Sequence, residues 1–162
     1  MFDQELKTIS QKLAKQCLDK DICLVTAESC TGGLLSAIFT EIPGSSKWFD
    51  RGYVTYSNNA KIKILGVSEK NLNKFGAVSQ EIANEMSLGA LKQSEANLSI
   101  SVTGIAGPEG GTENKPIGTV FFAITKQNKV LFEHKANFTG SREVIRRESI
   151  LFVLNKLLKL TL

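Results

Sequence analysis

The sequence predicts an α/β fold, a three-layer α/β/α sandwich in which helices cover both faces of a mixed sheet. Segments with helical spacing of apolar residues alternate with apolar runs of strand length through most of the chain. Two consecutive strand-like runs near the C-terminus are typical of a hairpin, which adds antiparallel strands to the sheet. With 42% hydrophobic residues in 162, the chain has enough apolar material for a core. We therefore expect one domain, residues 1–162, with helices packed on a mixed sheet.

The N-terminal part of the chain predicts a helix, a strand and a second helix. From Asp3 to about Leu18, apolar residues recur every three or four positions, as in an amphipathic helix. The continuous apolar run 22–27 is typical of a strand that is covered on both faces. It leads into the polar turn 28–33, after which a helical pattern resumes at residues 34–39. The order is therefore strand, glycine-containing turn, helix.

A further strand and a short helix are predicted next. Residues 42–46, Ile-Pro-Gly-Ser-Ser, break the second helix, and residues 48–56 favour a strand because Tyr, Val and Thr prefer extended backbone. The turn 57–59 is positioned to cap a short helix over residues 60–65, which Gly66 ends.

The second half of the chain contains one more helix-rich stretch, three strands and a closing helix. The helix-rich stretch has Ser79 as its expected N-cap and continues through Ala96. The other predicted elements are an alternating strand over 98–103, strands over 119–125 and 130–138 joined around residues 127–128, and a helix over 141–160. The glycine-dense loop 104–118 is long for a compact domain, and such loops are usually functional.

Composition argues against several classes of protein. No apolar run approaches the roughly 20 residues that cross a bilayer, and the N-terminal segment resembles neither a signal peptide nor a transit sequence. We therefore expect a cytoplasmic protein. The odd number of cysteines (Cys17, Cys23 and Cys30) is expected to stay reduced. The single His134 and the spacing of Cys and carboxylates match no metal site, so neither a metal nor another cofactor is expected.

The net charge of +4 is spread along the chain and does not form a tail or stripe. Aromatic residues do not interleave with the basic ones as a base-stacking surface requires. Neither nucleic acid nor a membrane is therefore expected as a partner. A mild basic excess is compatible with a small anionic substrate.

The turn after the first strand is the most informative local feature. A helix N-terminus offers unpaired N–H groups and a field that favours negative charge, and Gly32 and Gly33 let backbone approach a ligand closely. Ser29 in such a turn would be a nucleophile next to oxyanion donors. In the alternative interpretation, Ser29 or Thr31 is only the N-cap of the following helix. The local sequence leaves both open.

A serine nucleophile needs a base. His134 lies on a predicted hairpin strand with no evident orienting partner, so a lysine with a lowered pKa is the more natural candidate. Lys61 follows a strand end and precedes apolar residues, and Tyr56 is near enough in sequence to relay a proton. Lys61 and Lys63 are alternatively solvated charges on a helix, which is the commoner state of lysine.

Cys30, next to Ser29, is a second candidate nucleophile, because a helix N-terminus lowers the pKa of a thiol. Without a credible histidine partner, we expect it to be a buried structural thiol.

The last predicted helix begins with an unusual concentration of positive charge. Arg142 and Arg146 lie four residues apart near its N-terminus, where cations oppose the helix dipole and repel each other. This arrangement indicates an anion nearby. Protein carboxylates such as Glu143 and Glu148 and a ligand phosphate fit equally well, because guanidinium binds both.

Four motifs together resemble the CinA C-terminal family in their stand-alone form, and the similarity extends over nearly the whole chain. They are, in order, Ala27-Glu28-Ser29-Cys30-Thr31-Gly32-Gly33, Pro43-Gly44-Ser45-Ser46, Gly52-Tyr53-Val54-Thr55-Tyr56-Ser57-Asn58 and Gly104-Ile105-Ala106-Gly107-Pro108. The resemblance implies deamidation of nicotinamide mononucleotide to nicotinate mononucleotide and ammonia, a step of pyridine nucleotide salvage, by a Ser/Lys hydrolase without metal. It implies Ser29 as nucleophile, Lys61 as general base and Tyr56 as its assistant.

The resemblance also implies a substrate site. The residues expected to bind the phosphorylated nucleotide are Cys30, Thr31, Gly32, Gly33, Thr103, Gly104, Ala106, Gly107, Arg142 and Arg146, with the two arginines facing the phosphate. A homodimer or larger homo-oligomer is expected on the same basis. Two other functions stay open: a non-catalytic nucleotide-binding module, and an interaction protein associated with competence or DNA damage.

Overall fold

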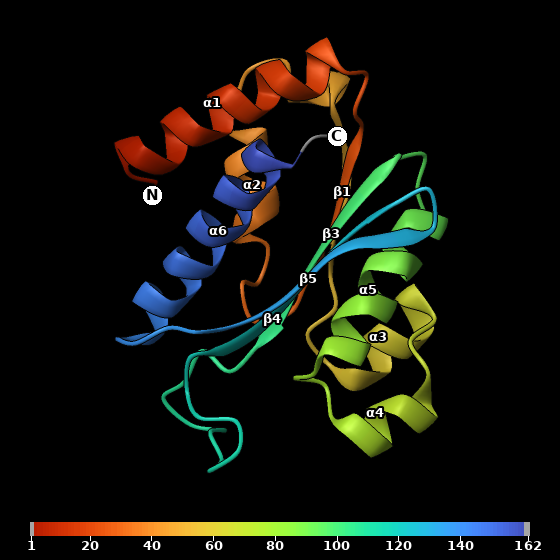
Figure 1. Cartoon of the computed structure of the whole chain (residues 1–162), viewed down its shortest axis with the longest axis vertical. Coiled ribbons are helices and arrows are strands. Elements are labelled where there is room, and N and C mark those ends of the chain that lie inside the picture. Colours follow the sequence, from red (N-terminus) through yellow and green to blue (C-terminus); the bar gives the residue numbers. More distant parts are fainter. Residues whose placement is uncertain (1, 161–162) are drawn as a thin grey trace.

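The computed structural model describes residues 2–160 and contains one mixed sheet between two layers of helices (Figure 1). Its strands are β1 (Leu24–Glu28), β2 (Phe49–Val54), β3 (Leu98–Gly104), β4 (Thr119–Lys126) and β5 (Lys129–Asn137). They lie in the order β2-β1-β3-β4-β5, with β1 parallel to β2 and β3, and with β4 antiparallel to β3 and β5. The predicted α/β fold with a mixed sheet is confirmed.

The helices divide between the two faces of the sheet (Figure 1). On one face are α1 (Gln4–Asp19), α2 (Leu34–Thr40) and α6 (Arg142–Lys159); on the other are α3 (Asn58–Leu65), α4 (Glu69–Phe75) and α5 (Gln80–Lys92). The 3-10 helix η1 (Ser45–Lys47) precedes β2. Phe39, Trp48 and Phe122 belong to the larger apolar core, on the α6 side, and Ile82 and Met86 to the core under α5. Within residues 2–160, every helix is too short or too polar to span a bilayer.

The structure differs from the sequence predictions in the bounds of β1 and of the helix-rich stretch, and in the burial of β3. β1 begins two residues later than expected and includes Glu28, so the turn starts at Ser29. The predicted helix-rich stretch is two helices, and the second ends at Lys92, short of Ala96. β3 alternates in sequence but is buried on both faces: the Ser99 and Ser87 hydroxyls are 2.7 Å apart, and α5 covers the serine face. Small hydroxyl side chains bonded to a helix can therefore line a buried face.

The parallel strands bring three chain segments to one edge of the sheet. The residue after β1, Ser29, donates its amide to Val102 of β3, and the residue after β2, Thr55, donates its amide to Glu28 of β1, both at 2.9 Å. The loop that follows β3 leaves from the same edge, and its residues 105–118 extend from the body of the molecule (Figure 1). The carboxyl ends of parallel strands are where α/β folds usually place ligands.

Candidate active site

Ser29 and Lys61 meet at this edge. Ser29 is the first residue after β1, and Lys61 lies in α3, which begins at the predicted cap Ser57 and ends at Gly66. The Nζ of Lys61 is 3.1 Å from the Oγ of Ser29. Both side chains are buried, with Lys61 1% exposed and Ser29 8% exposed. The structure thus brings together a hydroxyl and an amine that are 32 positions apart in the sequence.

The surroundings of Lys61 suit a neutral amine. Its Nζ donates to the main-chain oxygens of Thr55 at 2.7 Å and Tyr56 at 3.3 Å. A protonated amine donates to these two carbonyls and to the Ser29 hydroxyl oxygen at 3.1 Å. A neutral amine keeps two hydrogens for the carbonyls and turns a lone pair to the Ser29 hydroxyl. Burial lowers the pKa of Lys61 to about 8. The interpretation of Lys61 as a solvated charge is wrong, whereas Lys63 on the same helix is exposed.

Glu28, which immediately precedes Ser29, has a structural role that the sequence did not predict. Its carboxylate is fully buried and accepts hydrogen bonds from the amides of Gly33, Leu35 and Ser36 at the start of α2. The N-cap position of α2 is Gly33, which has no side chain to serve as a cap. An acidic residue shortly before a helix that lacks a capping side chain was the available signal.

Glu28 corrects two expectations about the turn. Neither Ser29 nor Thr31 is the N-cap of α2; the Thr31 hydroxyl instead donates to Glu28 at 2.8 Å. The first amides of α2 are also not free for a ligand, because Gly33, Leu35 and Ser36 are already bonded to the carboxylate.

Cys30 is a buried thiol in the core on the α6 side. Burial raises its pKa to about 12, which overrides the lowering expected from the nearby helix N-terminus. The thiol is therefore protonated near neutral pH, and it is a poor nucleophile there because the thiolate is the reactive form.

The end of β3 and the start of the loop after it make close contacts with neighbouring segments. The Thr103 hydroxyl donates to the carbonyl of Ala77 at 2.8 Å, so it fastens the segment before α5. Gly104 packs so closely on Thr119 that a Cβ there would lie 2.7 Å from the Thr119 oxygen. Gly107 has a φ of +78°, and Ala106 before it is buried.

The two arginines of the α6 N-terminus bind carbonyls of the site and make no ion pair within the described residues. Arg142 donates to the carbonyl of Gly107 at 2.8 Å and to the Tyr56 hydroxyl at 3.0 Å. Arg146 donates to the carbonyl of Thr31 at 2.8 Å, next to Gly32. Of the two predicted carboxylate partners, Glu148 pairs with the neighbouring Arg147, and Glu143 forms no ion pair within residues 2–160.

Arg147 forms ion pairs with Asp3, Glu5 and Glu148, so the carboxylate alternative for Arg142 and Arg146 is wrong. Tyr56 also differs from expectation: its side chain is 60% exposed and bonds Arg142, and its contact with Lys61 is made by its main-chain oxygen.

A hydroxyl in contact with a buried amine is the pairing of nucleophile and base that acyl-transfer hydrolases use. Residues 2–160 contain no group of three His, Cys, Asp or Glu side chains placed to share a metal ion. His134 is exposed on β5, where its ring stacks on Phe152 with centroids 4.8 Å apart. Lys61 is therefore the amine that the structure places beside the Ser29 hydroxyl.

Known proteins resemble the chain over almost its full length. The chain is 43% identical over 157 residues to the nicotinamide-nucleotide amidohydrolase PncC of Escherichia coli strain K12, covering 97% of this chain and 95% of that protein. The protein of that name from Pseudomonas putida is 42% identical over 155 residues, with 96% of each chain covered. The crystal structure of the competence/damage inducible protein CihA from Agrobacterium tumefaciens has a TM-score of 0.93 at 40% identity, covering 97% of this chain and 96% of that one.

The family model described as the CinA C-terminal domain matches residues 6–161. That match includes the turn with Ser29, the helix with Lys61 and the α6 arginines. The chain belongs to the CinA C-terminal domain family.

Proposed function

We propose that this protein is a nicotinamide-nucleotide amidohydrolase that converts nicotinamide mononucleotide and water to nicotinate mononucleotide and ammonia. The observation that carries the proposal is the 3.1 Å contact between the Ser29 hydroxyl and the buried amine of Lys61. The names of the full-length relatives from Escherichia coli and Pseudomonas putida support the substrate. The reaction belongs to pyridine nucleotide salvage.

In the acylation step, neutral Lys61 takes the hydroxyl proton of Ser29 while Oγ attacks the carboxamide carbon of the substrate. A C–O bond forms and the carbonyl oxygen becomes an oxyanion. The protonated amine then gives its proton to the amide nitrogen as the C–N bond breaks, so ammonia leaves and an ester remains on Ser29. Burial assists because it keeps Lys61 near the pKa at which one group acts as both base and acid.

In the deacylation step, water attacks the ester, Lys61 accepts a water proton, and the serine oxygen leaves and is reprotonated. Oxyanion donors are expected from the turn directly after Ser29 and from the loop 104–107. The first amides of α2 are poor candidates, because Glu28 already accepts their hydrogen bonds.

The phosphate of the substrate is proposed to bind at Arg142 and Arg146. Each guanidinium has five N–H donors, and the hydrogen bonds to Gly107, Tyr56 and Thr31 use only some of them. Tyr56, which is exposed and whose hydroxyl accepts from Arg142, is proposed to orient the substrate and to assist Lys61 through its main-chain oxygen.

A non-catalytic nucleotide-binding module is the competing function. Burying a lysine amine has an electrostatic cost that the binding of a nucleotide does not require. The lowered pKa of Lys61 favours an enzyme, since perturbed groups concentrate at catalytic sites.

The test is to incubate the purified protein with nicotinamide mononucleotide and to follow ammonia and nicotinate mononucleotide together. Equimolar release of both products is expected. Calorimetric binding of the mononucleotide without either product would support the binding module and contradict the proposal.

A further inference from the structure

The proposed mechanism does not use the most heavily hydrogen-bonded carboxylate of the site. Oε2 of Glu28 accepts from the Thr31 hydroxyl at 2.8 Å and from the Gly33 and Leu35 amides at 3.0 Å each. Oε1 accepts from the amide of Ser36 at 2.8 Å and from its hydroxyl at 2.6 Å. With 0% exposure, this carboxylate depends entirely on the protein for its partners.

Residues of β1 and β2 extend the hydrogen-bond network of this carboxylate and leave space for it. The Thr26 hydroxyl of β1 lies 2.8 Å from the Ser36 hydroxyl and extends the network. Gly52 of β2 faces the same place: a Cβ there would lie 2.0 Å from the Ser36 oxygen and 2.8 Å from the Thr26 oxygen. Only glycine at position 52 leaves room for these hydroxyls, so β1, β2 and α2 all accommodate the buried network.

Glu28 also connects to both reacting groups. Its side chain holds Thr31, and the amide of Gly32 in the same turn donates to the carbonyl of Ser29 at 3.0 Å. Its main-chain oxygen accepts from the amide of Thr55 at 2.9 Å, and the carbonyl of Thr55 accepts from Lys61 at 2.7 Å. The positions of Ser29 and Lys61 are therefore both tied to this one residue.

We infer that Glu28 is a positioning residue for Ser29: an internal anion that takes the N-terminus of α2 and holds the turn 29–33 in the shape that reaction requires. A carboxylate at a helix N-terminus is favoured by the helix field. Because the carboxylate fills this place, the substrate phosphate binds elsewhere. The inference deepens the proposed function and rests on it for its kinetic readout.

Glutamine is a sharp probe of this role. Both oxygens of Glu28 accept from backbone amides, so either orientation of a glutamine amide points an NH₂ group at N–H donors. Thr31→Val is the second probe, because it removes one donor to the carboxylate and leaves the α2 amides bonded. Glu85→Gln is the matched control: Glu85 also accepts from a backbone amide at a helix start, that of Ser68 at 2.7 Å, but at α4.

The experiment measures kcat and KM with nicotinamide mononucleotide, the rate of Ser29 modification by phenylmethylsulfonyl fluoride, and the circular dichroism and Tm of each variant. For Glu28→Gln we expect kcat to fall about 100-fold with KM within about twofold, since small misplacements of reacting groups cost that much. The modification rate should fall in parallel. Thr31→Val should lose about 10-fold in both rates at an unchanged fold, and Glu85→Gln should match the wild type in both.

If Glu28→Gln lowers Tm but leaves both rates of the folded protein within about twofold of Glu85→Gln, the role is merely structural and the inference is overturned. If Glu28→Gln does not fold, the Thr31→Val variant decides the question. Wild-type values of its kcat and of its Ser29 modification rate would overturn the inference, and parallel losses in both would support it. A wild-type protein that is modified at Ser29 but releases no ammonia contradicts the proposed function alone, and slower modification of Glu28→Gln would still support positioning. A wild-type protein that neither releases ammonia nor is modified at Ser29 would overturn the proposed function and the positioning role of Glu28 alike.

Discussion

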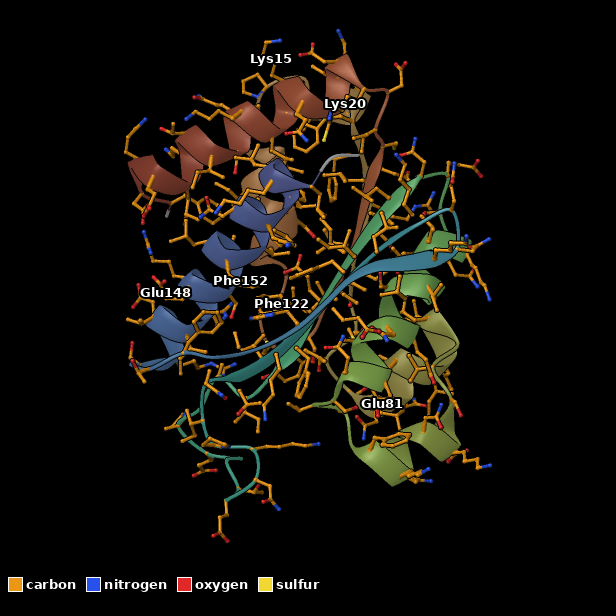
Figure 2. The ribbon with its side chains drawn as sticks, in the orientation of Figure 1. Lys15, Lys20, Glu81, Phe122, Glu148 and Phe152 are labelled. Atoms are coloured by element: carbon orange, nitrogen blue, oxygen red, sulfur yellow. The ribbon has the colours of Figure 1, made fainter. Side chains whose placement is uncertain are left out.

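The Ser29–Lys61 edge and the groove between β5 and α6 differ in ways that show what marks a reactive site. The groove has a volume of about 600 Å³ and is lined by the single histidine and by Phe132, Phe138 and Phe152. Phe152 of α6 also faces Phe122 of β4, with ring centroids 4.8 Å apart (Figure 2). In the groove, the His134 ring stacks on the rings of Phe132 and Phe152, and the Lys156 Nζ lies 4.3 Å from the ring centroid of Phe132. The groove thus offers space and a histidine, but its groups are already partnered.

At the Ser29–Lys61 edge the electrostatics are unusual, because a lysine side chain is 1% exposed there. An amine is buried there against two carbonyls and a hydroxyl, and burial holds its pKa at about 8. The comparison teaches that desolvation of a titratable group distinguishes the proposed active site, whereas cavity volume and the presence of histidine point to the groove.

The largest expected effect separates the two regions directly. Ser29→Ala should reduce ammonia release by about 10³-fold or more, because removal of a nucleophile eliminates the covalent route. His134→Ala in the groove should leave kcat within about twofold of the wild type. Steady-state ammonia release measures both variants. Comparable losses in the two would contradict the proposal that the reaction takes place at Ser29 and not in the groove.

The second effect distinguishes the buried lysine from an exposed one on the same helix. Lys61→Met should lower kcat by about 10² to 10⁴-fold, the range that a general base contributes. Lys63→Met is the matched control and should retain wild-type kcat, since its side chain is exposed. Equal losses in the two variants would count against Lys61 as the base.

The pH dependence tests the electrostatic difference itself. Desolvation favours the neutral amine, so kcat should rise with pH as Lys61 loses its proton and level off above about pH 8. An ordinary lysine would place this limb near the usual value of 10.5. A pH profile of kcat that is flat from pH 6 to 10, roughly the range over which lysine-dependent rates change, would contradict a titrating base of this kind.

A smaller effect is expected at the arginines of α6. Arg142→Ala should raise KM about 10-fold, or about 1.4 kcal/mol, because it removes a proposed phosphate contact and frees Tyr56. Arg147→Ala, which loses ion pairs to Asp3 and Glu5, should lower Tm and leave KM unchanged. If the KM of the two variants changes equally, Arg142 has no special part in binding.

The smallest effect on activity is expected from the aromatic groove. Phe152→Ala should lower the free energy of unfolding by about 2 kcal/mol, less than a fully buried phenylalanine would, because Phe152 is only partly buried. Its kcat should stay at the wild-type value. Denaturant unfolding gives the first quantity, and a large loss of kcat in the folded variant would link the groove to the reaction.

Local pattern was sufficient for much of the fold. The buried strand before Ser29, the hairpin around Gln127 and Asn128, the capping turn 57–59 and the cap Ser79 were all predicted, because each depends on a few neighbouring residues. The double burial of β3 was not predictable from alternation, because it depends on hydroxyls of another element, such as Ser87.

The candidate site also contains features that the sequence predicts and features that only the fold reveals. Ser29 and Lys61 were predicted as nucleophile and base through motif and order, and the structure brings their side chains within 3.1 Å of each other. The capping role of Glu28 was missed because its partners lie in a helix that only the fold brings around it. The arginine partners were missed for a related reason: the carbonyls of Thr31 and Gly107 belong to distant segments and leave no signal in side-chain chemistry.

The most direct test of the central claim is mass spectrometry of the protein quenched in acid during turnover of nicotinamide mononucleotide. We predict a covalent adduct of nicotinate mononucleotide on the peptide that contains Ser29, mapped by fragmentation to the serine and absent from Ser29→Ala. An adduct mapped to the neighbouring Cys30, or full activity in Ser29→Ala, would contradict the account.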